Sequence, residues 1–191
     1  IIVFVASPKN WHFILMGVLG ILMCVGFIAT AGYRADRIRI WLAPEKYDDG
    51  YQTMQSLYAI GSGGFFGRGL GNSIQKMGFI PESHNDMIFS VICEELGLFG
   101  AVLTIIMFIL LIYRCTVLAI NSGDRFGGLI AVGVMAHIAV QVLINISVVT
   151  NTIPPTGVPL PFISYGGSSI FFLLLEMGLM FAVARQIKPG R

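Results

Sequence analysis

The sequence predicts an all-α, polytopic transmembrane helix bundle with one long extracytoplasmic loop. Two observations lead to this fold class. The 191 residues are 55% hydrophobic and 12% charged, whereas a soluble domain has roughly 25% charged residues. The apolar residues also gather in four long runs, and a helix needs roughly 20 such residues to cross a bilayer. We therefore expect an integral membrane protein with about four spans.

The four expected spans occupy residues 11–31, 87–113, 127–149 and 168–184. Residues 32–86 are expected to form the long extracytoplasmic loop, and residues 150–167 a second loop on the same side. The second run would be about 40 Å long as a helix, which exceeds the hydrocarbon thickness, so its outer turns project or the helix tilts. Because the chain begins without Met or a basic segment, we expect a fragment, residues 1–191, of one membrane domain, with residues 1–6 ending an upstream helix.

Charge excludes one class of partner and favours one orientation. The net charge of +2 is small and the basic residues are scattered, so no nucleic-acid partner is expected. The loop at 150–167 has four prolines and no charged residue. In the long loop at 32–86, acidic residues offset part of the positive charge of the basic ones. By the positive-inside rule, both loops then lie outside, opposite the short flanks that contain Arg114, Arg125 and Arg185.

The stretch "FIPESHNDMIFSVICEELG" at 79–97 gathers ionisable side chains at the mouth of the second span. One interpretation of Asn85 and Asp86 is a helix N-cap. A second is that Glu82, His84 and Asp86, which alternate along the chain, bring two ligands to one divalent cation. Glu94 and Glu95 would lie about 12 Å deeper, where a carboxylate meets lipid headgroups.

Two segments of the long loop are unusual in composition. "GSGGFFGRGLG" at 61–71 has six glycines but no phosphate-loop register, which favours close backbone packing or a re-entrant turn. Arg34, Arg37 and Arg39 are interleaved with aromatic residues. They are either interfacial anchors or a set of guanidinium groups that captures a lipid-linked phosphate.

Polar residues also interrupt the last two spans. His137, Gln141 and Asn145 recur every four residues, so they form one polar stripe that should face protein or a wet cavity. Glu176 is expected to be a structural partner of this stripe, with a polar path as the alternative. Ser168 or Ser169 is expected to cap the last helix, whose start could also hold an anion.

Three blocks together carry a family resemblance: "GYRADRIRIW" at 32–41, residues 50–97, and "PPTGVPLPFISYGGSS" at 154–169. In order and spacing they resemble the SEDS family (shape, elongation, division and sporulation), and "GRGLGNSIQK" is more similar to the FtsW and sporulation branch than to the RodA branch. The resemblance implies that this chain corresponds to the C-terminal part of a protein with about ten helices.

The resemblance implies a peptidoglycan glycosyltransferase that polymerises lipid II at the outer face of the bacterial cytoplasmic membrane. Its implied partners are a class B penicillin-binding protein, which is a transpeptidase, and other division or elongation membrane proteins. The essential aspartate of the family lies in a PExHTD block and matches Asp86 in "PESHND", where Asn85 replaces the usual Thr. Asp86 is thus the expected catalytic base of an inverting transfer.

We expect the substrate-binding residues to lie in the same blocks, as Arg34, Arg37, Gln52, Lys76, Glu82, His84, Ser164 and Ser168. A divalent cation, Mg or Mn, with Asp86 and Glu82 as candidate ligands, is an alternative to the arginines for stabilising the pyrophosphate. Two other functions stay open on the sequence: a flippase for lipid-linked precursors and a non-catalytic scaffold of the division machinery.

Overall fold

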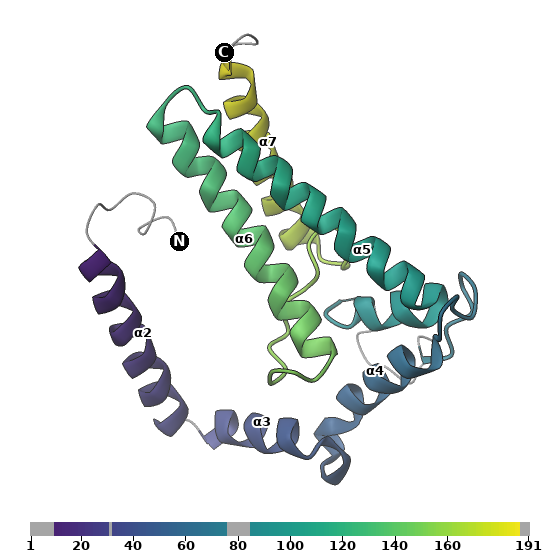
Figure 1. Cartoon of the computed structure of the whole chain (residues 1–191). Coiled ribbons are helices and arrows are strands. Elements are labelled where there is room, and N and C mark those ends of the chain that lie inside the picture. The colour runs from purple at the N-terminus through teal and green to yellow at the C-terminus, as the bar shows by residue number, and fades with distance from the viewer. Residues whose placement is uncertain (1–9, 31, 76–84, 188–191) are drawn as a thin grey trace.

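The computed structural model describes residues 10–30, 32–75 and 85–187, and within these ranges it is helical without a strand. The α-helices keep the numbering of Figure 1, and two short 3-10 helices, η1 and η2, join α3 to α4. In chain order the elements are α2 (Asn10–Thr30), α3 (Gly32–Leu42), η1 (Pro44–Lys46), η2 (Asp48–Gly50), α4 (Tyr51–Ser62), α5 (Ile88–Ile120), α6 (Arg125–Val149) and α7 (Gly167–Gln186). The expected all-α class is confirmed.

Helices α5, α6 and α7 form the body of the molecule and lie side by side (Figure 1). In the described part of the chain, these three are long and apolar enough to cross a membrane. Helix α2, which corresponds to the first expected span, has a shorter apolar stretch, Ile14–Met23. It contacts α3 and stands apart from the α5–α7 bundle (Figure 1). The protein is therefore a multi-pass membrane protein.

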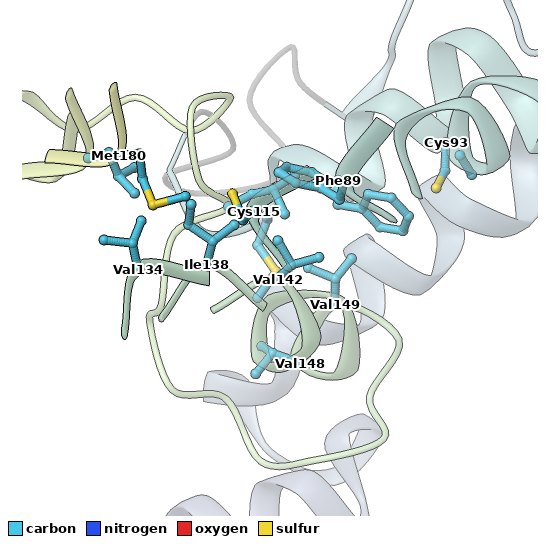
Figure 2. Packing of buried hydrophobic residues seen from close by; sticks show 14 of the residues in the cluster. Phe89, Cys93, Cys115, Val134, Ile138, Val142, Val148, Val149 and Met180 are labelled. Atoms are coloured by element: carbon cyan, nitrogen blue, oxygen red, sulfur yellow. The ribbon is translucent and has the colours of Figure 1, made fainter. Parts of the chain in front are cut away.

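Apolar side chains at the contact between α5, α6 and α7 form the core (Figure 2). Phe89 from α5, Ile138 and Val149 from α6, and Met180 from α7 are each at most 3% exposed. Because lipid tails are as apolar as these side chains, van der Waals packing rather than removal from water holds the helices together. This packing fixes the α6 backbone, which carries the polar stripe.

One end of the bundle, here called the loop end, carries α3, α4 and the proline loop (residues 150–166). Residues 32–86 were expected as a loop, but their described part folds largely into α3, η1, η2 and α4. Helix α4 packs against α5 and α6 and buries the small side chains of Thr53, Ser56 and Ala59, and the Ser56 hydroxyl donates to the carbonyl of Val149 in α6 at 3.1 Å. These helices are short and carry polar residues, so they give no long apolar run in the sequence.

Helix α5 is broken at Gly97, whose backbone (φ 66°, ψ −161°) belongs to a region that only glycine adopts readily. The break separates residues 88–96 from residues 98–120. The second part is about 35 Å long, close to what a span requires. The excess length noted in the sequence is therefore resolved by a break at the loop end. The helix also continues to Ile120, past the expected end at residue 113.

Candidate active site at the loop end

Asp86 lies half-buried in the turn that precedes α5. The helix begins at Ile88, its N-cap is Met87, and no side chain caps it. Instead, Ser90 donates from both its amide (3.0 Å) and its hydroxyl (2.7 Å) to the carbonyl of Met87. The interpretation of Asn85 and Asp86 as an N-cap is therefore wrong.

The proline loop passes directly beside this carboxylate. A Cβ atom built on Gly157, which has a positive φ of 71°, would lie 4.0 Å from Oδ2 of Asp86. The neighbouring residues of the loop are tied to α6. Gln141 donates from Nε2 to the carbonyl of Pro159 at 3.0 Å. The carboxylate thus faces a backbone segment that α6 fixes.

Asn145 joins the Asp86 turn to the proline loop. Its side chain is fully buried, and its Nδ2 donates to the carbonyl of Asp86 at 2.7 Å and to that of Val158 at 2.8 Å. Breaking either hydrogen bond would leave a buried amide without a partner, which is unfavourable. The Asp86 turn and the proline loop are therefore held in one relative position. The polar stripe of α6 was expected to face protein, and at Gln141 and Asn145 it does.

Helix α3 holds the proline loop at other positions. Nη1 of Arg37 donates to the carbonyl of Pro155 at 2.7 Å, and Nε1 of Trp41 donates to the carbonyl of Asn151 at 2.9 Å. Pro155 is two residues from Gly157, which lies beside Asp86. The guanidinium group of Arg37 and the carboxylate of Asp86 therefore both adjoin the same short stretch of the proline loop.

The glycine-rich loop (residues 61–71) packs its backbone onto the break in α5. A Cβ on Gly67 or on Gly97 would overlap backbone atoms of the other segment, so this approach requires glycine. The break leaves helical amides and carbonyls without partners in the helix. Four hydrogen bonds of 2.8–3.2 Å replace them: Arg68 and Gly69 donate to the carbonyls of Glu94 and Glu95, and Leu98 and Phe99 donate to those of Gly64 and Phe65. The expected close backbone packing is confirmed.

Four of the predicted substrate-binding residues cannot be placed by their side chains. Lys76, Glu82 and His84 lie outside the described residues, and of Arg34 only the backbone, in α3, is described. The expected cation site therefore keeps one described ligand, Asp86. Among the described residues, no group of three or more His, Cys, Asp or Glu side chains is arranged to hold a metal ion. These assignments stay predictions.

Gln52, Ser164 and Ser168 are described and lie in different surroundings. Gln52 is half-buried in the first turn of α4, and Ser168 is exposed in the first turn of α7. Ser164 is buried, and its Oγ accepts from the amide of Leu160 at 2.6 Å, which closes a turn of the proline loop. The expected serine cap of α7 is wrong, because its N-cap is Gly166 and has no side-chain bond.

The third member of the stripe, His137, pairs with Glu176 halfway along α6 and α7. Nδ1 of His137 lies 2.8 Å and 3.0 Å from the two carboxylate oxygens of Glu176. The His137 side chain is 51% exposed and that of Glu176 is 22% exposed. Glu176 is therefore a partner of the stripe, as expected, and the pair lies about two helical turns along α6 from Asn145, which bonds to Asp86.

Two contributors to the loop end were missed in the sequence. Glu94 was expected to meet lipid headgroups, but its side chain is buried and bonded to Ser73, so that expectation is wrong. Nothing in the sequence shows that residues 73–75 cover α5. Gly157 lies beside Asp86 although about 70 residues separate them, and no local pattern signals that contact. The four-residue period of the α6 stripe did signal a buried polar face.

Comparison with known proteins extends the sequence argument. The chain is 43% identical over 187 residues to stage V sporulation protein E of Bacillus subtilis, covering 97% of this chain and 51% of that protein. It is 38% identical over 190 residues to the probable peptidoglycan glycosyltransferase FtsW of Trichlorobacter lovleyi, covering 98% and 50%. The chain thus spans about half the length of the curated relatives it matches.

A solved structure and a family model agree with these relatives. The structure, described as the structural coordination of polymerization and crosslinking by a peptidoglycan synthase complex, superposes with a TM-score of 0.74 at 28% identity, over 99% of this chain and 53% of that one. The model of the cell cycle protein family FtsW/RodA/SpoVE matches residues 1–189. The expected resemblance is confirmed, and the chain belongs to the FtsW/RodA/SpoVE family of cell cycle proteins.

Proposed function

We propose that the complete protein containing this chain is a peptidoglycan glycosyltransferase that polymerises lipid II, with Asp86 as the general base. The observation that carries the proposal is the setting of Asp86. Its carboxylate does not cap α5, it faces Gly157, and Asn145 fixes its main chain. A relative that is 38% identical is named a probable peptidoglycan glycosyltransferase, which supports the same activity.

The chemistry requires one base. Asp86 takes the proton from the acceptor sugar hydroxyl as the oxygen attacks the anomeric carbon of the donor, with inversion. The bond from that carbon to the lipid pyrophosphate breaks, and the electron pair leaves with the pyrophosphate. Asp86 then releases its proton to water. The pyrophosphate is already a good leaving anion, so it needs charge stabilisation more than a general acid.

Arg37 of α3 is the proposed source of that stabilisation among the residues whose side chains are described. The bond from Arg37 to the carbonyl of Pro155 keeps a guanidinium group at the stretch of the proline loop that adjoins Asp86. Guanidinium forks match phosphate oxygens. A divalent cation, Mg or Mn, is the alternative source. A chelator that abolishes activity, with recovery on adding back Mg²⁺ or Mn²⁺, would favour the cation.

We further propose that the loop end faces outside the bacterial cytoplasmic membrane. The proline loop has no charged residue, whereas Arg114, Arg125 and Arg185 gather near the opposite end of the bundle. A class B penicillin-binding protein is the proposed partner. The solved structure that resembles this chain is a synthase complex that combines polymerization with crosslinking, which supports such a partner.

A flippase for lipid-linked precursors is the second candidate, because the His137–Glu176 pair lies halfway along α6 and α7. Transporters place their substrate sites near the middle of the membrane, where charged groups are otherwise rare. If this candidate is correct, replacing His137 would stop transport of lipid II across vesicles, and replacing Asp86 would not. A non-catalytic scaffold would tolerate both replacements.

The deciding experiment gives lipid II to the purified complete protein with its penicillin-binding partner and measures the initial rate of glycan synthesis. General-base catalysis contributes ~10²- to 10⁴-fold, so Asp86→Asn should lose activity on that order. Asp86→Glu should retain part of the rate, because it keeps the carboxylate but displaces it. The matched control is Asp48→Asn, an exposed acid of η2 at the same end. A wild-type rate in Asp86→Asn would remove Asp86 from the chemistry.

A further inference from the structure

The glycine-rich loop (residues 61–71) exposes large apolar side chains although its backbone packs onto α5. Phe65 is 74% exposed, Phe66 is 89% exposed and Leu70 is 76% exposed. Large apolar side chains gathered at a protein surface mark a contact with another protein or with a membrane. The position of the loop along α5 decides between these two kinds of contact.

Backbone hydrogen bonds fix the level of the loop relative to α5. The amide of Leu98 donates to the carbonyl of Gly64 at 2.8 Å, and the amide of Phe99 donates to that of Phe65 at 3.2 Å. Leu98 and Phe99 begin the part of α5 that follows the break, and both side chains are exposed. Residues 64 and 65 therefore lie at the level where the membrane-spanning part of α5 begins.

That level corresponds to one edge of the hydrocarbon. Residues 96–113 contain no charged side chain, and they are flanked by Glu95 and Arg114. At the helical rise per residue they cover about 27 Å, close to the hydrocarbon thickness of roughly 30 Å. The residues of α5 that bond to the loop are the third and fourth of this stretch. The loop is therefore held at the boundary between hydrocarbon and headgroups.

The backbone and charge of the loop are compatible with this boundary. Amides that meet lipid need partners, and the amides of residues 67–69 donate to carbonyls of the loop or of α5 at 2.8–3.0 Å. Arg68 is the single charged residue of the loop, so no acidic group repels lipid phosphates. The loop follows α4 at the edge of the molecule that lies away from α2, so α2 does not cover it (Figure 1).

We propose that the glycine-rich loop is a membrane anchor, which inserts Phe65 and Phe66 into lipid at the boundary between headgroups and hydrocarbon. Large apolar side chains bind this boundary because it removes their surface from water. Lipid is the occupant because the exposed apolar surface of the loop adjoins Leu98 and Phe99, which belong to a membrane-spanning helix. The anchor does not depend on the proposed glycosyl transfer. Through its bonds to α5, it holds the break at Gly97 at the membrane surface.

The test attaches a nitroxide spin label to single cysteines of the complete protein, in a background without native cysteines. The protein is placed in bilayers of phosphatidylethanolamine and phosphatidylglycerol. Collisions of the label with oxygen, which concentrates in hydrocarbon, are compared with collisions with a water-soluble nickel complex. Phe66→Cys tests the anchor, Glu45→Cys in η1 is the control for an exposed site in water, and Met107→Cys is the control for an exposed site within the span.

The ratio of oxygen to nickel collisions at residue 66 should exceed the ratio at residue 45 and approach the ratio at residue 107. A ratio at residue 66 equal to that at residue 45 would place the loop in water and overturn the proposal. Few collisions with either reagent would mean that protein covers residue 66, from a partner or from the rest of the complete chain. That result would also overturn the contact with lipid.

A tryptophan at the same position provides a second measurement without a flexible label, and it decides if the cysteine variant does not fold. Phe66→Trp keeps an aromatic ring at a site that is 89% exposed, so the substitution needs no rearrangement of the core. The fluorescence that this variant adds to that of the wild type should fall when the lipids carry bromine on their acyl chains near the headgroups. Added fluorescence that brominated lipids leave unchanged would overturn the proposal.

Discussion

The two parts of α5 are stabilised in different ways. Residues 88–96 are enclosed at the loop end, and Phe89, Val91 and Glu94 are each at most 4% exposed. Residues 98–120 present large apolar side chains outward, among them Phe99, which is 68% exposed, and Met107, which is 60% exposed. The first part is held by loops and polar bonds, and the second by its own backbone hydrogen bonds and by contacts on one face.

This difference shows where a membrane protein tolerates an irregular backbone. Within hydrocarbon, an unpaired amide or carbonyl is strongly unfavourable, so a span must satisfy its own backbone. The break at Gly97 occurs where the glycine-rich loop replaces the lost helical bonds. The loop end can therefore hold an unusual geometry around Asp86, while residues 98–120 remain an ordinary span.

The largest expected effect on stability comes from replacing a phenylalanine in each of the two parts of α5. Phe89→Ala removes a side chain that is 3% exposed in the core, and such a change lowers the free energy of unfolding by about 3–5 kcal/mol. Phe99→Ala removes an exposed ring and should lower it by about 0.5 kcal/mol or less. Unfolding of the complete protein in mixed detergent micelles, by rising dodecyl sulfate, measures both. Equal losses would mean that the two parts are not distinct.

The sequence was sufficient for the fold class, and its family resemblance supplied the proposed base. Apolar runs predicted the helices of the bundle, and the "PESHND" block singled out Asp86. The period of the α6 stripe predicted a buried polar face. The partners of that face were not predictable, because Asn145 bonds to carbonyls of Asp86 and Val158 in two separate loops. Backbone carbonyls are present at every residue, so the sequence carries no sign of which ones are used.

Glu94 and residues 32–86 show a second limit. The sequence places Glu94 at the depth of the lipid headgroups only on the assumption that lipid surrounds the helix at that position. The fold instead places Ser73 and its neighbours over Glu94. Whether a side chain meets lipid or protein depends on tertiary contacts that a local pattern does not contain. Tertiary contacts also decide the structure of α3 and α4. These two helices are short and carry polar residues, so packing against their neighbours stabilises them more than helix propensity does.

The second expected effect concerns the junction between the two parts. Gly97→Ala introduces a Cβ at positive φ and against the backbone of the glycine-rich loop, so stability should fall by about 3 kcal/mol. Gly178→Ala is the control, because it lies in α7 with open space around it and should change stability by about 1 kcal/mol or less. A stable, fully active Gly97→Ala variant would show that the break is not required.

The third expected effect tests the link between α6 and the Asp86 turn. Asn145→Leu removes the donor shared by the carbonyls of Asp86 and Val158, and it should lower stability by about 2 kcal/mol and slow glycan synthesis. Asn121→Leu removes a comparable bond, from Nδ2 to the carbonyl of Val117, at the exposed opposite end. If Asn121→Leu slows synthesis as much, the loop end holds no special role for Asn145.

The smallest expected effect concerns Arg37, which bonds to the proline loop from α3. Arg37→Ala removes one charge-assisted hydrogen bond and the guanidinium fork proposed to bind phosphate, so the rate of glycan synthesis should fall about tenfold. Arg37→Lys keeps the charge without the fork, and it should lose less. The measurement is the initial rate on lipid II at several substrate concentrations, which separates binding from turnover.

Arg39→Ala is the control for this pair of variants. Arg39 lies on the same helix and is exposed, and its Nη1 donates to Oδ1 of the exposed Asp36 carboxylate at 3.4 Å. Surface pairs of this kind contribute little, so this variant should keep its rate. If Arg37→Ala and Arg39→Ala are equally active, Arg37 is an interfacial anchor and makes no substrate contact. The stabilisation of the pyrophosphate would then have to come from Arg34, from residues 76–84 or from a divalent cation.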